Sequence, residues 1–211
     1  MVKTPKVIIL RTAGTNCDME TAHAFTVCGA EVDLVHVNEL ERSEKSLGDY
    51  HILAIPGGFT YGDDIASGKI LANEIKYKLG GELRKFIEKG KLVIGICNGF
   101  QALVRMGLLP GGVDDLGKQP RIGLFLNAGL HHISTFAHTR VTATSSPWLA
   151  GTDPSRRYTV PISHGEGRLI ASEEELQTLR AGGQIATQYV EYNPKGSADA
   201  IEGITSPDGR I

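Results

Sequence analysis

The stretch that decides the fold covers residues 91–101 and reads KLVIGICNGFQ. Its first half is a short apolar run, which is typical of a strand buried on both faces of a parallel sheet. Its second half passes Cys97 and is predicted to form a helix over residues 99–106, which Gly107 ends. A buried strand that turns at once into a helix indicates a layered α/β protein.

The same alternation precedes this stretch. Apolar runs predict further strands over residues 6–10, 31–37 and 50–55. Helical spacing predicts helices over residues 18–28, 65–79 and 82–88. Sites in parallel sheets form at the carboxyl ends of the strands. The loops after Leu10, Ile55 and Ile96 are therefore the candidate site loops.

The second half of the chain is less regular. A loop is predicted over residues 110–120, strands over residues 122–143, 158–162 and 184–191, a helix over residues 173–181 and a hairpin-type turn over residues 206–209. The strands in 122–143 are expected to be antiparallel. Because no linker and no internal repeat interrupts the sequence, residues 1–211 are predicted to form a single domain.

Composition excludes several classes of function. The net charge is −2 and the pI is about 6.4, so a basic nucleic-acid-binding surface is not the main feature of the chain. No run of about 18 apolar residues is present, so no membrane span is expected. The three cysteines are odd in number and lack CxxC spacing, which favours a reducing, cytoplasmic location over a disulfide framework.

The candidate nucleophile is Cys97. Gly95 and Gly99 flank it in the pattern G-x-C-x-G, which is typical of a nucleophile elbow when it joins a strand to a helix. The amino end of the following helix favours the thiolate, and the N–H of Asn98 is placed to stabilise an oxyanion. The alternative is a buried, inert cysteine at a helix start.

A second glycine-rich loop follows the strand at residues 50–55. In PGGF (residues 56–59), the pair that ends at Gly58 can turn backbone N–H groups toward a developing oxyanion. The alternative is an ordinary glycine turn. Asp63 and Asp64 lie further along the same loop. They are expected either to cap the next helix or to order the oxyanion loop.

Four segments carry a family resemblance: GTNCD (14–18), PGGFTYGDD (56–64), GICNGFQ (95–101) and HGEGR (164–168). NPKGS (193–197) and SPDGR (206–210) extend it. With these motifs, nearly the whole chain resembles the class I glutamine amidotransferases. More narrowly, it resembles the glutaminase subunits of phosphoribosylformylglycinamidine synthases of purine biosynthesis.

The resemblance implies a flavodoxin-like three-layer sandwich with a mostly parallel central sheet and additional antiparallel strands in the second half. It implies that Cys97 attacks the side-chain amide of L-glutamine and that water releases glutamate from the resulting thioester. The N–H groups of Gly58 and Asn98 would form the oxyanion hole, and Gln101 would line the glutamine pocket.

The resemblance also implies partners. Ammonia would pass to a large synthetase subunit that uses ATP and magnesium, and a small third subunit would complete the complex. No cofactor or metal is expected in this chain itself.

The catalytic base is the point at which the sequence departs from the family. His164 and Glu166 mimic the H-x-E spacing of the family's catalytic pair. In the family, however, that pair lies in a P-H-P-E stretch just after the SPDGR-type turn, and this sequence stops at Ile211. We therefore expect a C-terminal segment to be missing, either omitted or truncated. His164 is expected to be a turn residue or part of a loop near the site or a partner, and not the base.

Other polar residues have simpler interpretations. The spacing of His131, His132 and His138 fits no common zinc pattern, so these residues are expected to occupy exposed strand positions. Cys17 is expected to be a structural thiol near the site, and Cys28 is expected to lie in the core.

Two other functions stay open at this stage. One is a cysteine hydrolase of the related intracellular peptidase or deglycase group, against which Gln101 and PGGFTYGDD argue. The other is a catalytically incomplete subunit that only binds a partner.

Overall fold

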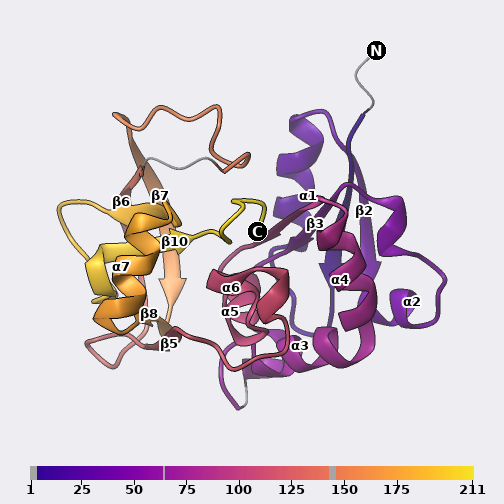
Figure 1. Cartoon of the computed structure of the whole chain (residues 1–211), viewed down its shortest axis with the longest axis horizontal. Helices are drawn as coiled ribbons and strands as arrows, with labels where there is room; N and C mark the ends of the chain where they lie inside the picture. Colours follow the sequence, from indigo (N-terminus) through magenta and orange to yellow (C-terminus); the bar gives the residue numbers. More distant parts are fainter. Residues whose placement is uncertain (1–3, 64, 143–145) are drawn as a thin grey trace. The chain divides into compact units, whose positions relative to one another are not determined.

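The computed structural model describes residues 4–63, 65–142 and 146–211. It contains two compact units (Figure 1). The first comprises the chain up to Met106 with Leu116–Lys118 and Ile211, and the second comprises Gly107–Asp115 and residues 119–210.

A parallel sheet forms the centre of the first unit. Its strands are β1 (Lys6–Arg11), β2 (Glu31–His36), β3 (Ile52–Ile55) and β4 (Leu92–Gly95), in the order β2-β1-β3-β4. All four predicted strands are confirmed. The apolar side chains of β1, and Leu53, Ala54 and Ile55 of β3, are buried, as expected for the central strands of a sheet that is covered on both faces.

The first-unit helices are α1 (Asp18–Val27), α2 (Val37–Glu41), α3 (Lys69–Glu74), α4 (Gly80–Glu88) and α5 (Asn98–Arg105). Ala22 and Phe25 of α1 pack against Val7, Ile9 and Ala54 of the sheet. Helix α5 packs against β3 and β4 on the other face of the sheet. Ile55 and Gly95 approach this helix, and Ile55 points to the face opposite Ala54 because side chains alternate along a strand. The predicted three-layer α/β arrangement is therefore confirmed.

The predicted helix over residues 65–79 was wrong at its start. Helix α3 begins only at Lys69, after Gly68 in a left-handed conformation with φ +71°. The side chain of Asp63 accepts a hydrogen bond from the N–H of Gly68 (3.1 Å), which holds this part of the chain in a turn. A π-helical turn, Ile75–Leu79, then joins α3 to α4 without a break.

An antiparallel sheet organises the second unit, as the alternation in the sequence predicted. Its order is β10-β9-β6-β7, formed by β6 (Ile133–Val141), β7 (Arg157–His164), β9 (Ile185–Tyr189) and β10 (Ile201–Ile204). A separate pair joins β5 (Gly123–Leu126) to β8 (Glu166–Ile170). Helix α7 (Glu173–Ala181) matches its predicted bounds, and Ala143, the predicted end of a strand, lies outside the described residues.

Several short elements were not predicted, among them helix α2. Strands β8 and β10 were missed, and the predicted loop over 110–120 contains the end of α6 (Leu108–Gly111) and a 3₁₀ turn, Val113–Asp115. The predicted turn is present, since the N–H of Gly209 donates to the carbonyl of Ser206 (2.9 Å). None of the helices in the described ranges is long and apolar enough to cross a membrane.

Candidate active site

Cys97 lies at the carboxyl end of β4, directly before α5, and its side chain is exposed. Its backbone has φ +52° and ψ −106°, a conformation that a residue with a β-carbon rarely adopts. The predicted elbow is therefore present, and the prediction of a buried, inert thiol is not supported. Because Cys97 directly precedes α5, it lies at the positive end of the helix dipole.

The two glycines that flank the elbow are required by space. A β-carbon on Gly95 would lie 2.6 Å from the carbonyl oxygen of Gly99 and 2.6 Å from Cδ1 of Leu103. A β-carbon on Gly99 would overlap the carbonyl oxygen of Ile55. Strand β3, strand β4 and helix α5 thus meet so closely that only glycine fits at either position.

The peptide group between Gly57 and Gly58 has a fixed orientation. The carbonyl oxygen of Gly57 accepts hydrogen bonds from the N–H groups of Asn16 (3.3 Å) and Cys17 (3.1 Å). In a trans peptide the N–H points opposite to the carbonyl, so the N–H of Gly58 points away from the loop that carries Asn16. Gly57 itself lies against the nucleophile, since a β-carbon built on it would be 3.3 Å from Cβ of Cys97.

The side chain of Asn98 joins the glycine-rich loop to helix α5. It is fully buried; its Oδ1 accepts a hydrogen bond from Oγ1 of Thr60 (2.5 Å). Its Nδ2 donates to Oδ1 of Asp63 (3.0 Å) and to Oε1 of Gln101 (3.1 Å). The backbone N–H of Asn98 is the first of α5, so it has no acceptor within the helix.

This network decides between the two interpretations of Asp63. Its carboxylate bonds both to Asn98 and to the N–H of Gly68, so it orders the glycine-rich loop and does not cap a helix at residue 65. Asp64 lies outside the described residues. The role of Gln101 in glutamine binding stays a prediction. The sequence analysis did not predict that Thr60 belongs to this network. Its position directly after PGGF was the only sequence feature that could have indicated it.

The other two cysteines of the first unit, Cys17 and Cys28, do not share the position of Cys97 between β4 and α5. Cys17 lies beside the elbow, with its Sγ 3.6 Å from the β-carbon that Gly57 would carry. Burial, together with the carboxylates of Glu20 and Asp18, raises the pKa of the Cys17 thiol, so the thiol keeps its proton near neutral pH. The prediction that Cys28 lies in the core was wrong, because α1 ends at Val27 and leaves the next side chain exposed.

His164 ends β7 in the second unit, and its ring is buried. Neither ring nitrogen has a hydrogen-bond partner among the residues that the structure describes. Burial, and then the nearby charges of Lys195 and His132, lower the pKa of His164 to about 4, so the ring is neutral at pH 7. Glu166 begins β8 two residues later.

The three clustered histidines each bond locally. His131 contacts the carbonyl of Gly129 (2.8 Å), His132 contacts Oγ of Ser163 (3.0 Å), and His138 on β6 contacts Oγ1 of Thr159 (3.1 Å). All three side chains are exposed. Within the described ranges, no three His, Cys, Asp or Glu side chains gather as a metal site would require.

Comparison with known proteins places this geometry in a family. The family model described as a CobB/CobQ-like glutamine amidotransferase domain matches residues 4–211. A curated relative from Dehalococcoides mccartyi, phosphoribosylformylglycinamidine synthase subunit PurQ, is 42% identical over 98% of this chain and 81% of its own. The PurQ subunit of Methanococcus maripaludis strain S2 is 39% identical over 98% of this chain and 79% of its own.

A solved structure supports the same family. A chain in the structure of PurLQS from Thermotoga maritima is 29% identical and has a TM-score of 0.80, over 99% of this chain and 85% of that one. The chain described above therefore belongs to the glutamine amidotransferases. Within them it is a member of the family of PurQ subunits of phosphoribosylformylglycinamidine synthase.

Proposed function

We propose that this chain hydrolyses L-glutamine to glutamate and ammonia and supplies the ammonia to a phosphoribosylformylglycinamidine synthase of purine biosynthesis. The observation that carries the proposal is the exposed thiol of Cys97 at φ +52°, directly before α5 and against the Gly57-Gly58 peptide. Family membership favours this reaction over the peptidase or deglycase alternative.

The first half-reaction forms a thioester. The Cys97 thiolate attacks the side-chain amide carbon of glutamine, and the carbonyl π electrons move onto oxygen. When the carbonyl re-forms, the carbon–nitrogen bond breaks and the nitrogen leaves as ammonia after it takes up a proton. In the second half-reaction a water molecule attacks the thioester, glutamate leaves and the thiolate returns.

The N–H groups of Gly58 and Asn98 stabilise the oxyanion in both half-reactions. Two observations support this assignment. The Gly57 carbonyl is engaged on the side of Asn16 and Cys17, so the Gly58 N–H is directed away from that side. The first N–H of α5 has no intrahelical acceptor. Donors that are fixed before the charge develops stabilise it without reorganisation. Gln101, two residues beyond Gly99 on α5, lines the glutamine pocket.

We assign the proton transfers to a group other than His164. A ring with a pKa near 4 is a weak base, and its nitrogens are buried inside the second unit.

Two comparisons support the proposal that this chain acts within a synthetase complex. Relatives are named as subunits, and a related chain is part of the PurLQS structure. We propose a large synthetase subunit that uses ATP and magnesium, and a small third subunit, as the partners. No cofactor is assigned to this chain. The absence of disulfides among Cys17, Cys28 and Cys97, all of which are described, fits a cytoplasmic location.

Covalent labelling tests the assignment of the nucleophile. The protein, assembled with its synthetase, is incubated with the glutamine analogue 6-diazo-5-oxo-L-norleucine, and the intact mass and the modified peptide are measured. We expect one adduct, on Cys97, and no adduct on the Cys97→Ala variant.

Cys17→Ser and Cys28→Ser are the matched controls, because each removes a thiol of the same unit and is expected to leave the adduct intact. An adduct that persists in Cys97→Ala, or equal ammonia release by that variant and the wild type, contradicts the proposal. A folded, assembled wild type that neither reacts nor releases ammonia would instead identify a subunit that only binds its partner.

A further inference from the structure

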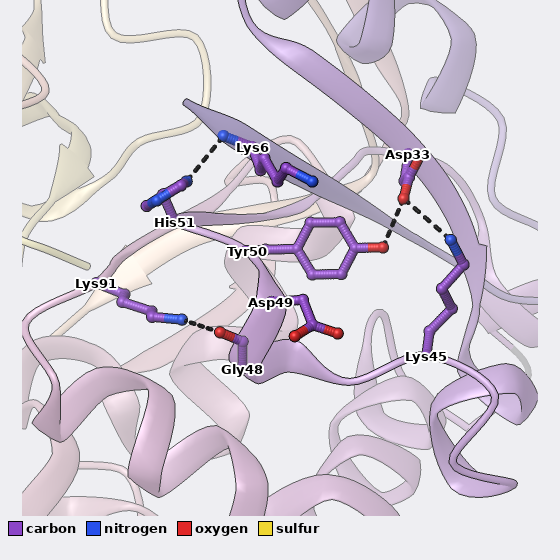
Figure 2. A pocket seen from close by; sticks show the side chains of 8 residues that line it. All are labelled: Lys6, Asp33, Lys45, Gly48, Asp49, Tyr50, His51 and Lys91. Atoms are coloured by element: carbon purple, nitrogen blue, oxygen red, sulfur yellow. Dashed lines mark hydrogen bonds and ion pairs between the residues drawn. The ribbon is translucent and has the colours of Figure 1, made fainter. Parts of the chain in front are cut away.

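A cavity lies in the first unit at the amino ends of the parallel strands, and Figure 2 shows the side chains that line it. Lys6 is the first residue of β1, and His51 and Lys91 directly precede β3 and β4. Cys97 follows the carboxyl end of β4, so the cavity is at the opposite edge of the sheet. Its volume of about 480 Å³ falls within the range of small-molecule sites.

Polar side chains at this edge connect the neighbouring strands β2, β1, β3 and β4. Nζ of Lys6 pairs with Glu31 on β2 (3.3 Å), and the backbone N–H of Lys6 donates to Nδ1 of His51 (2.9 Å). Because Nδ1 is an acceptor, the neutral ring carries its proton on Nε2 and keeps one donor. The carbonyl of His51 accepts from the N–H of Leu92 (3.1 Å), which brings Lys91 into the same row.

Lys45 and Asp33 line the side of the cavity opposite Lys91, and the Tyr50 ring lies between the two sides with its hydroxyl toward Asp33 (Figure 2). Asp33 accepts hydrogen bonds from the Tyr50 hydroxyl (2.6 Å) and from Nζ of Lys45 (3.2 Å). The Tyr50 hydrogen bond and the Lys45 ammonium keep the pKa of Asp33 low, so its carboxylate is ionised near neutral pH. The positive charge of Lys45 compensates this negative charge. The ammonium groups of Lys6 and Lys45 are thus held in place by carboxylates.

Lys91 differs from these two lysines. Its ammonium donates to the carbonyl oxygen of Gly48 (2.7 Å) and lies 4.9 Å from the centre of the Phe86 ring. No ion pair to a carboxylate is found for it within the described residues. Burial and the charge of Lys89 lower its pKa, and Asp49 offsets this only in part. A partly buried ammonium that lacks a paired carboxylate is stabilised by an added anion.

The wall of the cavity is ordered by a single carboxylate. Glu82 of α4 accepts hydrogen bonds from Oγ of Ser46 (2.7 Å) and from the N–H of Leu47 (2.7 Å). Oγ of Ser46 in turn accepts from the N–H of Gly48 (3.1 Å). The segment that supplies Gly48 and Asp49 is therefore fixed before a ligand arrives, which lowers the entropic cost of binding.

We propose that this cavity binds the phosphate group of a small phosphorylated metabolite, either a nucleotide or a sugar phosphate. Lys91 is the principal phosphate ligand, because an ammonium group binds phosphate as a point charge. Lys6 and Lys45 offset the negative charges of Glu31 and Asp33, which would otherwise repel a phosphate. Asp49 repels a bare anion but accepts a hydrogen bond from a sugar hydroxyl. A phosphate that carries a sugar therefore fits the lining better than inorganic phosphate does.

Titration at constant ionic strength tests the proposal. AMP, ribose 5-phosphate, inorganic phosphate and adenosine are titrated separately, and heat and the amide NMR signals of Gly48, His51 and Leu92 are followed. We expect AMP or ribose 5-phosphate to saturate these signals, inorganic phosphate to bind more weakly and adenosine not to bind. Tighter binding of AMP identifies a nucleotide, and equal binding identifies the sugar phosphate as the recognised unit.

Lys91→Gln is expected to weaken binding about tenfold or more, because it removes a charge-assisted hydrogen bond. Lys89→Gln is the matched control; it removes an exposed charge two residues away that does not line the cavity. If Lys91→Gln unfolds, Lys45→Gln is used instead; it leaves the Asp33 carboxylate without its ammonium partner and is also expected to weaken phosphate binding. The proposal is overturned if none of the phosphates saturates, if adenosine binds as tightly as AMP, or if the Lys89 and cavity variants lose affinity equally.

Discussion

Thr60 donates a 2.5 Å hydrogen bond from Oγ1 to Oδ1 of Asn98, and both side chains are buried. One residue follows the glycine-rich loop and the other begins helix α5, so this bond fixes the two candidate oxyanion donors relative to each other. It is the contact that the sequence offered least reason to expect.

Thr60→Val should weaken both the fold and the reaction. The substitution keeps the shape of the side chain but leaves the buried Asn98 oxygen without a donor, which costs about 1–3 kcal/mol. Urea unfolding followed by circular dichroism measures this loss, and the rate of Cys97 labelling measures its effect on the site. Thr26→Val, at an exposed hydroxyl that bonds the Ala22 carbonyl, is the control. Equal losses in both variants would show that the Thr60–Asn98 bond has no special role.

Gly99→Ala should destabilise the first unit by about 1–3 kcal/mol or more, because the added methyl group would overlap the Ile55 carbonyl. Gly81→Ala in α4 is the control. Nothing lies within 4 Å of the methyl group that it adds, so helix propensity predicts no change or a gain of up to about 1 kcal/mol. Thermal unfolding of both variants checks the difference. A Gly99→Ala protein as stable as Gly81→Ala would mean that α5 can move away from β3.

The buried ring of His164 should make stability depend on pH. Its pKa in the folded state, about 4, lies below the ordinary value of 6.5, so the unfolded chain binds the proton more readily. The stabilisation is therefore complete above pH 6.5 and is lost as the pH falls toward 4, by roughly 1–3 kcal/mol.

Fluorescence of Trp148, which lies in the same unit, reports urea unfolding at each pH. His164→Gln should flatten the dependence between pH 4 and 6.5, whereas His138→Gln, at an exposed strand position, should not. Identical pH profiles for the wild type and His164→Gln would exclude this residue as the cause.

Cys17 should react slowly with iodoacetamide at pH 7, because its raised pKa keeps the thiol protonated. Glu20→Gln removes one of the two carboxylates that raise this pKa and should shift the pH profile of alkylation to lower pH. The measurement is made in a Cys97→Ala, Cys28→Ser background, with Glu31→Gln as the control. An unchanged profile in Glu20→Gln would leave burial and the Asp18 carboxylate as the causes of the shift.

Most of the first unit could be predicted because its signals are local. A short apolar run such as residues 6–10 is buried on both faces of a parallel sheet, and the glycines around Cys97 report a tight approach of backbone to backbone. Both signals lie within a few residues of the feature that they predict.

The errors arose where distant contacts decide the structure. Helix α3 starts late because Asp63 holds the N–H of Gly68. The predicted break between residues 79 and 82 is absent, since a π-helical turn carries the chain from α3 into α4. Cys28 is exposed because α1 ends one residue earlier. Strand β8 is a short segment that begins next to Gly165 and contains Gly167, and it becomes a strand only through its pairing with β5.

The orientation of the Gly57-Gly58 amide depends on two hydrogen bonds that come from a different loop, at Asn16 and Cys17. A partner that pulled residues 14–17 aside would release the Gly57 carbonyl and let the amide rotate by half a turn. Loss of those two hydrogen bonds would then remove one oxyanion donor without any contact at the sulfur, so the reaction depends on a loop that carries no reacting group.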